Sequence, residues 1–168
     1  VLLPIIFNFI KKMNINNHKY DYFIHTNEDN INYIINKVKE IKIKNIEVIF
    51  DEDIKEQVLL NSVFAVCKSG TVSLQVSNSK VPSIIVYKLS FINFMIFKML
   101  VNVKFANIIN IINDREVIPE LLQNECNANE IYKSVIYFLK NPELIKKQLS
   151  DCSKTLDGIR SKTSSAYE

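Results

Sequence analysis

Short apolar runs alternate with stretches of helical periodicity along this 168-residue chain, and that alternation constrains its fold more than any other feature. A crossover helix between two strands returns the chain to the same end of the sheet, so this order is typical of parallel sheets. The pattern predicts an α/β fold, a parallel sheet with helices on both faces. Five runs have strand character: Tyr22–Ile24, Glu47–Phe50, Phe64–Cys67, Ile84–Tyr87 and Phe105–Ile108.

The helical stretches carry apolar faces and start signals. Ile31, Ile34, Ile35, Val38 and Ile41 recur at helical spacing between the first two runs. After the fifth run the pattern is purely helical, with Pro119 as the first residue of one predicted helix. Two later helices are predicted to begin at Asn127, with Glu130 as its capping partner, and at Asn141-Pro142.

Residues 1–168 contain no repeat and no linker, so we expect a single domain. The chain opens on an amphipathic run that ends in Lys11 and Lys12, and basic residues after the apolar stretch are not the order of a signal peptide. A doubly wound domain normally begins on a strand. We therefore expect a first strand, and with it a further domain, upstream of Val1.

Charge and cysteine usage exclude several classes of protein. The net charge is +3, from 21 basic and 18 acidic residues that are scattered along the chain. Scattered charge does not follow a phosphate backbone, so we expect no nucleic-acid partner. Cys67, Cys126 and Cys152 form no CxxC pair, and neither His18 nor His25 stands at ligand spacing from them. We expect reduced thiols and no zinc site.

The most apolar region, Ser83 to Val103, is interrupted by Lys88, Asn93, Lys98 and Asn102. An uninterrupted span needs ~20 apolar residues, so we expect no transmembrane helix. Phe91, Phe94 and Phe97 stand at helical spacing within it. Core packing is the simpler explanation, and peripheral contact with a membrane is the alternative.

A glycine stands where a ligand could bind. The chain has only two glycines, and Gly70 lies between the predicted strand Phe64–Cys67 and a helical stretch. A strand, a Ser-Gly-Thr turn and a helix together direct backbone N–H groups at one point, which suits an anion such as a diphosphate. A tight turn with a capping hydroxyl explains the same residues without a ligand. Neither GxGxxG nor GxxxxGK[ST] occurs.

A second polar cluster follows the fifth run, in the stretch NIINDREVIPELLQ. If Pro119 opens a helix, the residues before it form a loop at the carboxyl edge of the sheet. Ordinary surface charge is the alternative explanation. The candidate residues are Asn110, Arg115, Glu116, Glu120 and Gln123.

These two stretches carry a resemblance to the lipid-A-disaccharide synthase family. Members have an SGT-x-x-L-E segment, a G-V-P turn, a strand ending in Tyr-Arg or Tyr-Lys, and an N-L-L-x-x-R-E-x-x-P-E-L-L-Q segment. This chain has SGT at Ser69 to Thr71, then Pro82, then Tyr87-Lys88, and then Arg115 to Gln123, in the same order and at matching spacing. The resemblance is strongest from Ser69 to Gln123.

The resemblance implies the C-terminal, Rossmann-like half of a two-domain GT-B glycosyltransferase. The family transfers 2,3-diacylglucosamine from its UDP derivative to 2,3-diacylglucosamine 1-phosphate with inversion, giving a β(1→6) disaccharide and UDP. It implies these lipid substrates as partners, no metal or other cofactor, and a bacterial cytoplasmic protein at the inner membrane. The family's catalytic carboxylate and Gly-Ser-Arg loop would lie upstream of Val1, so we expect no catalytic residue here.

Residue by residue, the resemblance implies that Ser69, Gly70 and Thr71 bind the diphosphate. Asn110, Arg115, Glu116, Glu120 and Gln123 would lie by the donor sugar and phosphates. The chain departs from the family at Gln75, where an acidic residue would accept hydrogen bonds from the ribose, and at Asn113-Asp114, where a small residue and a glycine are usual. The alternatives are a non-catalytic α/β module that binds nucleotide or protein, and another GT-B enzyme that uses a UDP-sugar.

Overall fold

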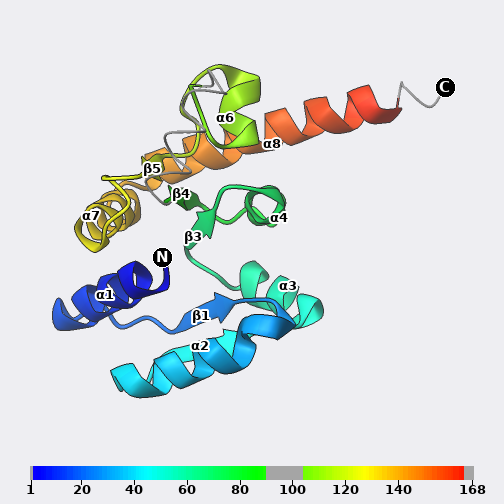
Figure 1. The fold of residues 1–168 in the computed structure, drawn as a ribbon. Coiled ribbons are helices and arrows are strands. Elements are labelled where there is room, and N and C mark those ends of the chain that lie inside the picture. Colours follow the sequence, from blue (N-terminus) through cyan, green and yellow to red (C-terminus); the bar gives the residue numbers. More distant parts are fainter. Residues whose placement is uncertain (1, 90–103, 165–168) are drawn as a thin grey trace.

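The computed structural model describes residues 2–89 and 104–164 (Figure 1). Helices and strands alternate through most of this part of the chain, and two helices end it. The elements are α1 (Leu2–Ile15), β1 (Tyr22–His25), α2 (Glu28–Ile41), β2 (Ile46–Ile49), α3 (Glu52–Leu60), β3 (Ala65–Lys68), α4 (Thr71–Asn78), β4 (Ser83–Tyr87), α6 (Ile108–Asn113), β5 (Glu120–Leu122), α7 (Ala128–Leu139) and α8 (Pro142–Ser164).

All strand pairs are parallel, and they form two sheets. One sheet pairs β1 with β2, and Tyr22 lies opposite Ile46. The other has the order β3-β4-β5, and Ile85 of its central strand lies opposite Glu120. The predicted α/β fold is confirmed, as are the first four of the five predicted strands.

The fifth predicted strand, Phe105–Ile108, is wrong. The side chain of Asn107 accepts a hydrogen bond from the N–H of Ile109 and caps α6 instead. The helix predicted at Pro119 is also wrong, because this proline directly precedes β5. Its carbonyl accepts from the N–H of Ile85 at 2.8 Å. Proline lacks an N–H to donate, which is tolerated at the start of a strand.

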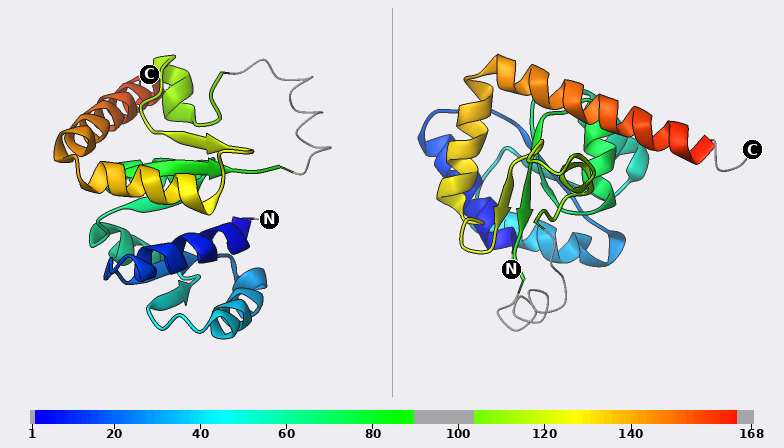
Figure 2. Two further views of the ribbon diagram at one scale, coloured as in Figure 1. Left: turned by 90° about the vertical axis from the view of Figure 1, so that its left-hand side faces the viewer. Right: turned by 90° about the horizontal axis from the view of Figure 1, so that it is seen from above.

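Helices cover both faces of the three-stranded sheet (Figure 2). Ile84 and Val86 of β4 pack with residues of α1 and α7, whereas Ile85, between them, packs with residues of α4, α6 and α8. Successive side chains of a strand point to opposite faces, so β4 joins two cores. It is buried accordingly: Ile84 and Ile85 are 0% exposed.

The helix starts follow the sequence signals. Asp51 accepts from the N–H groups of Asp53 and Ile54, and Asn127 accepts from those of Asn129 and Glu130. Pro142 opens α8 as expected.

Cys67, Cys126 and Cys152 are free and buried. Burial raises the pKa of the Cys67 thiol to about 12, so this sulfur is a protonated core group.

The described helices include none that is long and apolar enough to cross a membrane. The aromatic stretch at Phe91, Phe94 and Phe97, named above for core packing or membrane contact, lies outside the described residues.

Candidate functional site

The turn after β3 brings the first predicted site residues together. Ser69 follows the last strand residue, Lys68, and Thr71 is the first residue of α4. Between them, Gly70 has φ +138° and ψ −163°, a conformation that side-chain-bearing residues rarely adopt. The requirement for glycine in this turn is therefore one of backbone conformation.

The N-terminus of α4 has no side-chain cap. Asp51, Asn107 and Asn127 each place an oxygen on the first N–H groups of α3, α6 and α7, whereas Gly70 offers none to α4 and the side chain of Asn27 makes no such bond to α2. A Cβ at Gly70 would meet no described atom within 4 Å, so a side chain here is opposed by the backbone conformation and not by crowding. An open helix N-terminus with free donors attracts anions, because the N–H groups and the helix dipole act together.

Side chains around this turn fix it to the segment before α6. Ser69 Oγ donates to the carbonyl of Ala106 at 2.6 Å, and Ser73 Oγ donates to the carbonyl of Gly70, also at 2.6 Å. Asn107 Nδ2 donates to Ser73 Oγ at 2.8 Å. The Ser69 hydroxyl proton is therefore used within the protein. Thr71, by contrast, is exposed.

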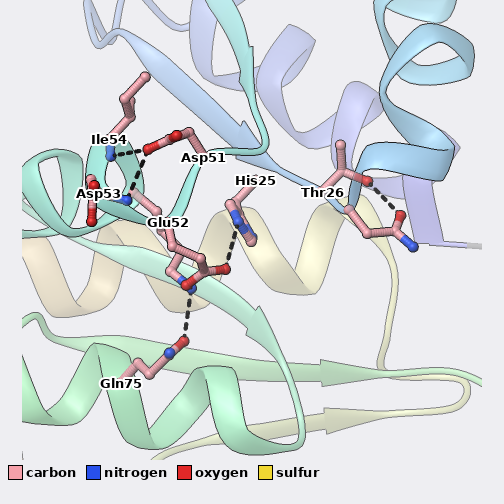
Figure 3. A network of polar contacts seen from close by, with 9 residues as sticks. His25, Thr26, Asp51, Glu52, Asp53, Ile54 and Gln75 are labelled. Atoms are coloured by element: carbon pink, nitrogen blue, oxygen red, sulfur yellow. Dashed lines mark hydrogen bonds and ion pairs between the residues drawn. The ribbon is translucent and has the colours of Figure 1, made fainter.

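A polar network lies beside the turn, between α3 and α4 (Figure 3). Lys55 of α3 is only 6% exposed, and its Nζ donates to Gln75 Oε1 at 3.0 Å. The same Nζ contacts Glu52, which lies 3.3 Å from Nε2 of His25 at the end of β1. The last residue of β1 thus meets the helices that follow β2 and β3, so the carboxyl ends of the three strands face the same edge.

The charges in this network are set by their neighbours. The hydrogen bond from Lys55 lowers the pKa of Glu52 and keeps it ionised. Burial lowers the pKa of His25, and the nearby Lys55 lowers it further, although Glu52 opposes both effects. His25 is therefore neutral near pH 7, and Lys55 supplies the positive charge beside Gln75. The sequence does not predict the burial of Lys55, because nothing in it distinguishes this lysine from the exposed charged residues of α3.

Asn110 lies in α6, not in the predicted loop, and is 0% exposed. Its amide group makes four hydrogen bonds inside the protein, with Oδ1 accepting from Val117 and Ile118 and Nδ2 donating to the Ile118 carbonyl and to Glu120. Four is the full capacity of an amide side chain. In this arrangement Asn110 has no group left for a ligand.

Glu120 opens β5 and is 9% exposed. Its Oε2 accepts from the N–H of Ala106 at 2.7 Å, and its Oε1 accepts from the N–H of Asn107 at 2.9 Å and from Asn110 Nδ2 at 2.7 Å. The carboxylate thus holds the segment to which Ser69 is bonded, and it faces the protein interior.

The predicted position of Arg115 and Glu116 at the carboxyl edge is wrong, because they precede β5. Val117, the next residue, is linked through Gln148 to Ser83, the first residue of β4. This is the amino edge of the sheet, where the residue before a parallel strand must lie. Arg115 pairs with Asp151 of α8 at 2.9 Å.

Gln123 follows β5 at the carboxyl edge, and its N–H donates to the carbonyl of Tyr87 at 2.9 Å. A hollow along β5 is lined by Glu116, Glu120, Glu125 and Glu130, among others. The carboxyl groups of Glu116, Glu125 and Glu130 disfavour a diphosphate in this hollow. Among the described residues, no three His, Cys, Asp or Glu side chains lie close enough together to hold a metal ion.

Comparison with known proteins gives consistent matches. The profile of the family described as lipid-A-disaccharide synthetase matches residues 1–168. A lipid-A-disaccharide synthase from Rickettsia bellii is 38% identical over 98 residues, which cover 58% of this chain and 26% of that protein. The lipid-A-disaccharide synthase from Persephonella marina is 37% identical over 106 residues, which cover 63% of this chain and 28% of that protein. The one from Rickettsia canadensis is 31% identical over 139 residues, which cover 77% of this chain and 35% of that protein. The chain thus spans about a quarter to a third of the relatives' length.

The two glycines allow a matched test of the turn. Gly70→Ala is expected to lower the free energy of unfolding by about 1–3 kcal/mol, the usual cost of a strained backbone conformation. Gly158 lies within α8, where an added Cβ also meets nothing. Gly158→Ala should raise stability by about 0.5–1 kcal/mol, because alanine is the better helix residue. Urea denaturation of both variants measures these changes in the free energy of unfolding. Equal changes in the two variants would mean that Gly70 is not held at a positive φ.

Proposed function

We propose that this chain, which belongs to the lipid-A-disaccharide synthetase family, is the part of a glycosyltransferase that binds the sugar-nucleotide donor. The reaction of the whole protein is the transfer of 2,3-diacylglucosamine from its UDP derivative to 2,3-diacylglucosamine 1-phosphate, with a β(1→6) disaccharide and UDP as products. The acylated substrates would be met at the cytoplasmic face of the inner membrane.

The observation that carries this proposal is the uncapped N-terminus of α4 behind Gly70. Its free N–H groups and the exposed Thr71 hydroxyl are donors at the carboxyl edge, where ligands of open α/β sheets bind. A diphosphate supplies the acceptors. As the glycosidic bond to UDP breaks, negative charge grows on the departing phosphate, and fixed donors stabilise it.

The proposed site is smaller than the set of residues that the resemblance implies. Gly70 and Thr71 would bind the diphosphate, Ser69 would anchor the turn through its hydrogen bond to the Ala106 carbonyl, and Gln75 would face the ribose. Gln123 would border the site. Asn110 and Glu120 act as positioning residues through the hydrogen bonds given above, and Arg115 and Glu116 lie too near the opposite edge to take part. The catalytic base would come from the acceptor-binding part of the protein.

One contact favours a second function, that of a non-catalytic nucleotide-binding module. Gln75 Oε1 already accepts a hydrogen bond from Lys55, which weakens its capacity to accept from ribose hydroxyls. A chain that had lost transferase activity could tolerate such a change. Under this alternative UDP still binds, and only the reaction of the full-length protein is absent.

Thr71→Ala tests the diphosphate site. Thr71 is exposed, so its loss should change thermal stability little. UDP affinity should fall by about 1.5 kcal/mol, roughly tenfold, through loss of a hydrogen bond to a charged group. Titration calorimetry with UDP measures it. Ser153→Ala, an exposed hydroxyl on α8, is the matched control and should leave affinity unchanged. If Thr71→Ala binds UDP as tightly as the parent does, the Thr71 hydroxyl does not contact the diphosphate.

Gln75→Glu tests the ribose assignment. A carboxylate at this position would keep the contact with Lys55 and leave a charged oxygen to accept from the ribose. UDP should bind about 1 kcal/mol more tightly, roughly fivefold. Gln57→Glu adds the same charge at an exposed position of α3 and serves as the control. If Gln75→Glu and Gln57→Glu bind UDP with equal affinity, residue 75 does not contact the ribose.

A further inference from the structure

Lys55 is a buried charge whose partner is a surface residue. Lys55 lies in α3 and is only 6% exposed, whereas Gln75 of α4 is exposed. The Nζ of Lys55 contacts Glu52, three residues earlier, and donates to Gln75 Oε1 at 3.0 Å (Figure 3). A buried ammonium group is tolerated only when it is paired and hydrogen-bonded. Gln75 therefore completes the surroundings of Lys55 and at the same time faces the solvent.

The contact with Lys55 fixes which atom of the Gln75 amide group faces inward. An ammonium group has three donors and no acceptor, so only the amide oxygen can face it. The amide nitrogen is consequently on the side away from Lys55. Among residues 2–89 and 104–164, no group accepts a hydrogen bond from Gln75 Nε2. Two N–H donors of Gln75 are thus available at the surface.

Gln75 lies one turn of α4 beyond the proposed diphosphate site. Thr71 is the first residue of α4, and Gln75, four residues later, lies on the same face of the helix. One helical turn is about 5.4 Å. Ribose is joined to the diphosphate of UDP through a single methylene group, so a diphosphate at Thr71 brings the ribose to the surface of α4 near Gln75.

The direction of the hydrogen bond between residue 75 and the ribose depends on the side chain. A carboxylate can only accept, so it uses the proton of a ribose hydroxyl. An amide whose oxygen is already bonded to an ammonium group donates instead, and it uses the oxygen of the hydroxyl. Glutamine without such a partner can do either, at the cost of ordering its side chain on binding.

We propose that Lys55 is a positioning residue that holds the Gln75 amide with its N–H groups toward the ligand, so that this chain binds a ribose hydroxyl through the oxygen of that hydroxyl and not through its proton. This inference rests on the proposed UDP site. It adds a residue of α3 to that site, and it makes the ribose contact of this chain opposite in direction to the contact that a carboxylate would make.

Ribose analogues of UDP distinguish the two directions. The 2′-deoxy and 3′-deoxy analogues each lack one hydroxyl, and the weaker ligand of the two identifies the hydroxyl in contact. Methylation of that hydroxyl removes its proton but keeps its oxygen. In calorimetric titrations of the full chain, the deoxy analogue should bind about fivefold more weakly than UDP, the usual effect of one neutral hydrogen bond, and the O-methyl analogue within about twofold of UDP.

Gln75→Glu provides the opposite direction in the same site. A carboxylate cannot donate to the methylated oxygen, so the O-methyl analogue should bind to this variant at least about fivefold more weakly than UDP does. The parent chain and Gln75→Glu should therefore differ in their preference between UDP and its O-methyl analogue, whatever their absolute affinities are.

Lys55→Met tests the positioning role, because methionine has a similar length and no donor. The affinities for UDP and for the O-methyl analogue should fall about threefold, the cost of ordering a freed side chain, and the affinity for the deoxy analogue should not change. Lys146→Met is the matched control. It removes an exposed lysine that lies 2.9 Å from Glu143, three residues earlier in α8, and should alter none of the three affinities.

The outcomes separate this inference from the proposed function. If the parent discriminates against the O-methyl analogue as strongly as Gln75→Glu does, Gln75 accepts from the ribose and the inference is wrong. An equal loss of affinity for all three ligands in Lys55→Met would show a purely structural role for Lys55, which also contradicts it. If Lys55→Met does not fold, the comparison of the parent with Gln75→Glu decides.

Two further results are informative about the site as a whole. If UDP binds to the parent but removal of either hydroxyl has no effect, the inference is overturned and the diphosphate site remains. If UDP does not bind to the parent, the proposed function fails, and this inference fails with it.

Discussion

The carboxylate of Glu120 organises the part of the structure on which the candidate site depends. It accepts three hydrogen bonds from Ala106, Asn107 and Asn110. The carbonyl of Ala106 in turn accepts from Ser69, and Asn107 donates to Ser73. A continuous chain of hydrogen bonds thus connects β5 with the turn at Gly70. Because buried polar groups are costly when unpaired, every member of this chain constrains the others.

This network explains how the short turn at Gly70, the proposed diphosphate site, is held in one conformation. The side chains of Ser69 and Ser73 hold the turn from within, and no side chain caps the first N–H groups of α4. Donors held in place before the ligand arrives need no reorganisation when charge develops on it.

The sequence predicted the fold class, four strands and the Gly70 turn, because each depends on local pattern or local conformation. It failed where a short apolar run is compatible with either a strand or a helix: Phe105–Ile108 has the composition of a strand but leads into the short, half-exposed helix α6. The three-residue strand β5 begins on a glutamate and has little strand signal of its own. The burial of Glu120 and Lys55 depends on partners distant in sequence, which no local pattern reveals.

The central claim is that the backbone N–H groups at the start of α4 bind the diphosphate of UDP. Titrating the ¹⁵N-labelled chain with UDP and recording amide chemical shifts by NMR tests it most directly. The account predicts that the amides of Gly70, Thr71 and Val72 shift the most and saturate with one dissociation constant. Shifts confined to the carboxylate-lined hollow along β5, or to Arg115 and Glu116, would contradict it.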